Sequence, residues 1–78
     1  MKMYLYSVKD RLADEFAPLF EAKNDAIALR VHATMMAKVP GLILSDFELY
    51  KLGHYDSTNA LVEGYETPLL INQVTKEV

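Results

Sequence analysis

The feature of this sequence that most restricts its fold is a single helix-forming segment set between strand-forming regions. Residues 26–38 contain no glycine or proline and are rich in alanine, leucine and methionine, a composition that favours a helix. Asn24 is a suitable N-cap, and Asp25 places a negative charge in the first turn. Pro40 and Gly41 follow the segment and end it. The chain can therefore offer one helix to cover a sheet.

Four segments around the helix predict strands because they are rich in tyrosine, phenylalanine, leucine and valine. They are residues 2–8, 15–22, 47–55 and 59–65. Pro18 has no N–H group, which indicates an edge or bulged position in the second strand. Gly53 inside the third strand indicates a bulge or a close backbone approach. Residues 56–59 are turn-forming and join the last two strands.

The predicted fold is therefore α+β with the order ββαββ. Two hairpins form a four-stranded antiparallel sheet, and the helix packs on one face of it. With 78 residues the chain has room for one domain, which we place at residues 1–66. Residues 67–78 form a C-terminal tail, for which a short extra strand and a frayed end are both open readings.

Strand alternation predicts that both faces of this sheet carry large apolar side chains. We expect Tyr4, Tyr6, Tyr50 and Leu52 on one face, and Met3, Leu5, Phe47, Leu49 and Tyr55 on the other. One helix covers only one face. The other face is then either a dimer interface or a binding platform.

The helix itself carries a wide apolar arc. We expect Ile27, Ala28, Val31 and Met35 to face the core, with Leu29, His32 and Met36 beside them. The arc is wider than the roughly 100° stripe of a helix packed on one core. Either a small core wraps around the helix, or part of the arc packs on a second subunit. The chain has no cysteine, and small domains without disulfides often gain stability by oligomerisation. We therefore predict a homodimer or a higher oligomer.

The sequence does not resemble an enzyme. Its serines lie in no context typical of an activated nucleophile, and its three glycines are isolated rather than grouped in a phosphate-binding loop. The acidic residues Asp46, Glu48 and Asp56 flank a predicted strand near His54. A metal site is one interpretation of this group, and a solvated edge with an exposed histidine is the favoured one. We predict no catalytic residues, no metal site and no cofactor.

The charge of the chain bears on nucleic-acid binding. A formal net charge of −3 argues against a general binder of duplex DNA, but single strands can be held by a local basic patch and stacked aromatic rings. The candidate patch is Lys23, Arg30 and Lys38 on the helix, and the candidate stacking residues are Tyr4, Tyr6 and Tyr50. The opposing interpretation is a solvated helix face and aromatic core residues.

Two stretches resemble a known family. One is residues 16–30, with the sequence FAPLFEAKNDAIALR, and the other is residues 46–56, with the sequence DFELYKLGHYD. Together with the tyrosine-rich start, they are similar to the small nonstructural protein of gokushovirus-type microviruses, which are single-stranded DNA phages. The resemblance spans about residues 2–66.

This resemblance implies a nonstructural DNA-binding protein that acts in viral genome replication or single-strand production, in the host bacterial cytoplasm. We expect single-stranded DNA as the partner and no association with membranes. The alternative function is an acidic adaptor that binds a phage or host replication protein, because the chain combines negative charge with excess apolar surface.

Overall fold

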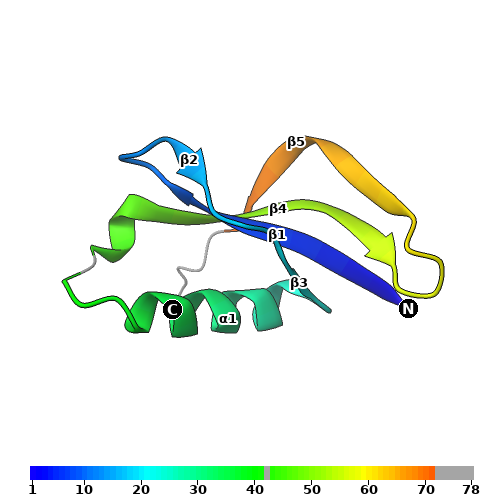
Figure 1. The fold of residues 1–78 in the computed structure, drawn as a ribbon, viewed down its shortest axis with the longest axis horizontal. Helices are drawn as coiled ribbons and strands as arrows, with labels where there is room; N and C mark the ends of the chain where they lie inside the picture. The colour runs from blue at the N-terminus through cyan, green and yellow to red at the C-terminus, as the bar shows by residue number, and fades with distance from the viewer. Residues whose placement is uncertain (42, 72–78) are drawn as a thin grey trace.

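A computed structural model of the chain describes residues 1–41 and 43–71, and it confirms the α+β class (Figure 1). The elements are β1 (Lys2–Asp10), β2 (Glu15–Phe16), β3 (Phe20–Ala22), α1 (Asp25–Ala37), a short 3-10 helix (Leu44–Asp46), β4 (Phe47–Asp56) and β5 (Val62–Ile71). The second predicted strand is split into β2 and β3 around Pro18, as expected for a residue that cannot donate to a strand ladder.

The sheet is antiparallel and has the strand order β2-β1-β4-β5, with β3 also paired to β1. The helix α1 lies along one side of the sheet, while β2 and the bend of β5 project on the other side (Figure 1). We call the side turned away from α1 the open face. The helix and the open face thus present two separate surfaces to possible partners.

The helix begins where the sequence predicted. Asn24 is the N-cap, and its side-chain oxygen accepts a hydrogen bond of 2.9 Å from the backbone N–H of Ile27. Asp25 in the first turn accepts a hydrogen bond of 2.7 Å from the Tyr6 hydroxyl and forms an ion pair of 3.1 Å with Lys51. These two contacts come from neighbouring strands of the sheet, so they fix the rotation of α1 about its axis.

That rotation differs from the predicted one. The side of α1 that carries Asp25 also carries Ala28 and His32, which are the buried residues of the helix. Of the four residues predicted to face the core, Ala28 is buried and Ile27 packs against the core. Val31 is only half-buried and Met35 is 36% exposed, so the predicted core side of the helix was wrong in part. The fully buried core consists of Tyr6, Val8, Ala22, Ala28 and Leu49.

A β-bulge in β4 changes which side chains share a face of the sheet. Tyr6 pairs with Lys51 and Leu5 pairs with Gly53, so Leu52 is an extra residue in β4. An extra residue reverses the alternation of the strand beyond it. Tyr50 therefore pairs with Ser7 on the open face, opposite to Tyr6, and Leu49 pairs with Val8 in the core. Each predicted face therefore contained an error: Tyr50 does not share a face with Tyr4 and Tyr6, and Leu49 does.

Gly53 lies beside this bulge, where the sequence predicted a bulge or a close backbone approach. A Cβ atom at Gly53 would collide with the carbonyl oxygen of Glu63 and lie 2.9 Å from the Cα of Gly64. The prediction is confirmed. The absence of a side chain lets β5 pair closely with β4 at this point.

The strand β5 begins and ends later than predicted. It passes through Thr67 and Pro68 and pairs with β4 again at Leu69 to Ile71, so the first part of the predicted tail is a continuation of this strand. Residues 65–68 lie opposite Leu52 alone, and Pro68 is placed in this irregular stretch, where a missing N–H costs little. Residues 72–78 of the predicted tail lie outside the described residues.

Candidate nucleic-acid interface

The three predicted basic residues lie along the helix. Lys23 precedes α1, Arg30 is in its middle and Lys38 is its C-cap, and all three are exposed. Their separations correspond to about 11–12 Å along a helix axis. Arg30 lies on the side of α1 opposite Ala28 and His32, away from the sheet. The structure therefore presents these residues as basic side chains spaced along the helix.

Tyr6, a predicted stacking residue, is completely buried. Its ring stacks on Phe20 with centroids 5.6 Å apart, and its hydroxyl is bound to Asp25. Burial and the bond to this carboxylate raise the pKa of the Tyr6 hydroxyl well above its ordinary value. Tyr6 holds the core together and is inaccessible to a base in this fold.

Tyr4 lies on the same side of the sheet as Tyr6 and packs against the core. The Lys51 ammonium is 4.0 Å from the centroid of the Tyr4 ring. Because Lys51 is also paired with Asp25, one face of the Tyr4 ring is already occupied by a cation. The expectation that Tyr4 and Tyr6 share an open surface with Tyr50 was wrong, since the bulge at Leu52 separates them.

Tyr50 is the predicted stacking residue that the structure places on the open face. It forms an edge-to-face pair with Phe16 of β2, with ring centroids 5.5 Å apart. Phe16 is 47% exposed, and Leu70, which pairs with Tyr50 from β5, is 51% exposed. Aromatic and aliphatic surface therefore runs across the open face from one edge of the sheet to the other.

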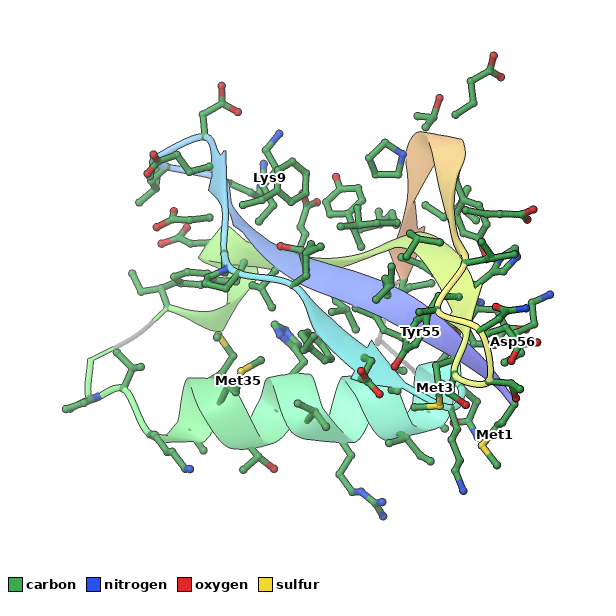
Figure 2. All side chains as sticks on the ribbon, turned by 45° about the vertical axis from the view of Figure 1, so that its right-hand side comes forward. Met1, Met3, Lys9, Met35, Tyr55 and Asp56 are labelled. Carbon is green, nitrogen blue, oxygen red and sulfur yellow. The ribbon has the colours of Figure 1, made fainter. Side chains whose placement is uncertain are left out.

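Two cations accompany this aromatic pair. The ammonium of Lys9 lies 5.7 Å from the centroid of the Phe16 ring, and Figure 2 shows the Lys9 side chain on the side of the sheet away from α1. Arg11 donates a hydrogen bond of 3.3 Å from its guanidinium to the carbonyl of Ser45. Burial and a hydrogen bond to Glu48 raise the pKa of the Tyr50 hydroxyl, and the charges of Lys9 and Arg11 oppose that rise.

We call Lys9, Arg11, Phe16 and Tyr50 the open-face cluster. Phe16 is exposed and Tyr50 is half-buried. Aromatic rings with nearby cations are the chemistry that can hold a single-stranded nucleic acid, because rings stack on bases and cations attract phosphates. Acidic groups limit the net positive charge of the cluster. Lys9 forms an ion pair of 3.2 Å with Asp14, and the Tyr50 hydroxyl donates to Glu48 at 3.1 Å.

Three members of this cluster were missed at the level of sequence. Lys9 and Arg11 lie in the segment between the first two predicted strands, and Phe16 lies in the second of these strands. A signal was present, since a tight hairpin between the first two strands pairs Lys9 with Phe16. Joining them to Tyr50 required knowing that Leu52 is the extra residue in β4, which the glycine at position 53 does not specify.

His54 is engaged differently from the solvated edge that was expected. Its Nε2 atom is 2.9 Å from a carboxylate oxygen of Glu63 on β5, and its Nδ1 atom is buried without a hydrogen-bond partner among the described residues. Asp56 pairs with the N-terminal ammonium at 3.1 Å. In the described part of the chain, no three His, Cys, Asp or Glu side chains are placed to hold a metal ion.

The chain is similar to a known family of phage proteins. A family model described as phage ORF5 protein matches residues 3–77. The chain belongs to the phage ORF5 protein family. No curated protein and no solved structure matches it. Membership in this family confirms the resemblance to a phage protein, while the narrower likeness to gokushovirus-type microviruses stays a prediction.

One further observation concerns membranes. Among residues 1–41 and 43–71 of this phage ORF5 protein, no helix is long and apolar enough to cross a bilayer.

Proposed function

We propose that this phage ORF5 protein is a nonstructural protein that binds single-stranded DNA through the open-face cluster, in the cytoplasm of the infected bacterium. The observation that carries the proposal is the Phe16–Tyr50 ring pair with Lys9 beside it on the open face. Stacking of a base on an aromatic ring contributes about 1–3 kcal/mol. The exposed ring of Phe16 and the half-buried ring of Tyr50 therefore provide a source of binding energy other than the charge of the chain, which is negative.

The proposal places the protein in genome replication or single-strand production, where a phage with a single-stranded genome exposes such DNA. Binding by stacking tolerates many sequences, because every base has a π-face. An acidic chain with few basic residues also suits transient contact better than permanent condensation of a genome. No catalytic role is part of this proposal.

The test is a fluorescence-anisotropy titration with single-stranded and duplex oligonucleotides at two salt concentrations. We expect tighter binding of the single strand. The variants Phe16→Leu and Tyr50→Leu keep apolar volume but remove the rings, so each should weaken binding by roughly tenfold, in line with the loss of one stacking contact.

The matched control is the triple variant Lys23→Gln, Arg30→Gln and Lys38→Gln, which changes the helix stripe on the other side of the molecule. Its affinity should change less than that of either leucine variant. If the triple variant loses binding and the leucine variants keep it, the interface is the helix stripe. If the wild-type protein binds no single strand at low salt, the proposed function is wrong.

We also propose that the protein self-associates. In the part of the chain that the structure describes, β5 is an edge strand with exposed apolar side chains at Val62, Leu69 and Leu70. Edge strands with apolar side chains are ready to pair with a second chain. Light scattering should report a dimer for the wild type and a larger monomer fraction for Leu70→Lys. A monomer at all concentrations contradicts the proposal.

A further inference from the structure

A cavity of about 280 Å³ lies between α1 and the β1–β2 hairpin, and Phe16 of the open-face cluster is part of its lining. Its apolar lining comes from Val8 of β1, Phe47 of β4, and Met35 and Met36 of α1. Figure 2 shows Met35 projecting from the end of α1 toward the β1–β2 hairpin. The cavity is therefore a gap between the hairpin and the C-terminal half of the helix.

The hairpin closes the other side of this cavity with small side chains. Ala13 and Ala17 line it, and both are exposed. The neighbouring residues Leu12 and Leu19 are also exposed, at 81% and 60%. Apolar surface in and around the cavity thus faces outward in the described structure, a property that marks interaction sites more often than monomer surfaces.

The charge of the cavity restricts its occupant. Asp10 and Glu15 line it, and the described lining contains no basic residue. Asp10 is held in place because its carboxylate accepts hydrogen bonds from the backbone N–H groups of Leu12 and Ala13, at 3.0 and 3.2 Å. Two carboxylates beside an apolar cavity repel phosphate groups and attract cationic ones.

We propose that this cavity is the docking site of a partner protein segment, which inserts one large apolar side chain next to an arginine or lysine. The volume lies just below the range of small-molecule sites, so it suits a single anchoring side chain. Methionine side chains adapt their shape to what packs on them, and Met35 and Met36 provide that adaptability. We do not assign a second copy of this chain to the cavity, because we place self-association at the edge strand β5, where Val62, Leu69 and Leu70 are exposed.

This docking site differs in chemistry from the proposed DNA site, since carboxylates and apolar side chains line it and no cation is in its described lining. The two sites share Phe16, which lines the cavity and also pairs with Tyr50. A partner bound in the cavity would therefore contact the same ring that we propose to stack on a base.

The test uses a library of random peptides displayed on phage, selected on the full-length protein and counterselected on Ala17→Phe. Ala17 is exposed, and its backbone N–H and C=O groups keep their bonds to Val8 and Ser7 whatever the side chain is. The new ring should fill the cavity without unfolding the protein. If circular dichroism shows that this variant is unfolded, Ala13→Phe takes its place.

We expect the enriched peptides to share a large apolar residue next to an arginine or lysine. A synthetic peptide with that consensus should bind the wild type at least roughly tenfold more tightly than Ala17→Phe. Glu15→Lys should also weaken it, whereas Glu66→Lys, the same charge change on β5, should have little effect.

Three results would overturn the proposal. The first is that no peptide is enriched over the counterselection. The second is that the enriched peptides lack a basic residue or bind Ala17→Phe as well as the wild type. The third is that Ala17→Phe abolishes self-association of the protein, which would show that a second copy occupies the cavity.

Discussion

The hydroxyl of Tyr6 donates a hydrogen bond of 2.7 Å to the carboxylate of Asp25, and this contact joins the centre of the sheet to the first turn of the helix. Burial alone would raise the pKa of Asp25, but the bonds from Tyr6 and Lys51 lower it below its ordinary value. The Asp25 carboxylate therefore connects the first turn of α1 with two strands of the sheet, β1 through Tyr6 and β4 through Lys51.

Removal of this hydroxyl tests how much the contact stabilises the fold. Tyr6→Phe should lower the free energy of unfolding by about 1–2 kcal/mol, because a hydrogen bond to a charged group is lost while Asp25 keeps Lys51 as a partner. Urea denaturation measures the change. Tyr55→Phe is the matched control, since its hydroxyl donates to Glu21 at the exposed surface. The Tyr6 variant should be the less stable of the two; the reverse order would contradict this account.

His32 gives the fold a predictable dependence on pH. It is 2% exposed, and neither ring nitrogen has a hydrogen-bond partner among the described residues. Desolvation lowers the pKa of His32 below its ordinary value of 6.5. Near and below that pH the unfolded chain binds a proton that the folded chain does not, so stability is full above about pH 6.5 and falls as the pH decreases.

The measurement is the free energy of unfolding between about pH 7 and pH 5. The wild type should lose stability over this range, and His32→Met should show a flatter profile because the titrating group is gone. At neutral pH the methionine variant should be at least as stable, since an unsatisfied polar group has left the core. Equal slopes for both proteins would exclude His32 as the cause.

Gly53 and Gly64 pair with each other across β4 and β5, but they tolerate substitution differently. A methyl group at Gly53 would collide with the backbone of Glu63, whereas nothing lies within 4 Å of one at Gly64. Gly53→Ala should cost about 1–3 kcal/mol, and Gly64→Ala should stay within about 0.5 kcal/mol of the wild type. Thermal melts of the two variants compare them directly. A similar effect at both sites would mean that the strands separate easily there.

The parts of the fold that the sequence predicted correctly depend on local chemistry. Asn24 accepts from the N–H three residues ahead, Pro18 interrupts the strand that contains it, and Gly53 marks a close approach. Each of these follows from the conformational limits of one residue type. The helix boundaries and the element order follow from the same kind of evidence.

The incorrect predictions concern the faces of β4 and the rotation of α1, which depend on residues that are distant in the sequence. Leu52 has no property that identifies it as the extra residue in β4, because the bulge arises only when β1 and β5 pair on either side. Tyr50 consequently lies on the face opposite to the predicted one. The rotation of α1 was also missed, because apolar residues surround much of the helix, and the contacts that orient it are made by Asp25 with Tyr6 and Lys51.

The ion pair between Lys9 and Asp14 provides the last prediction. Asp14 is 84% exposed and holds the Lys9 ammonium at 3.2 Å, so a phosphate group must compete with it for the same cation. Asp14→Asn removes that competition. The backbone of Asp14 has a φ of 56°, a conformation that asparagine also adopts readily, and the substitution should leave the fold intact.

If the open-face cluster binds single-stranded DNA, Asp14→Asn should bind it more tightly than the wild type at low salt. Its affinity should also fall more steeply with salt, by about 0.7 in the slope of log K against log salt for one added phosphate contact. Glu66→Gln is the control, because it removes the same charge from the opposite edge strand and leaves Lys9 paired. Anisotropy titrations over a series of salt concentrations measure both quantities. Equal affinities and slopes for the two variants would show that only net charge matters and that Lys9 does not contact the DNA.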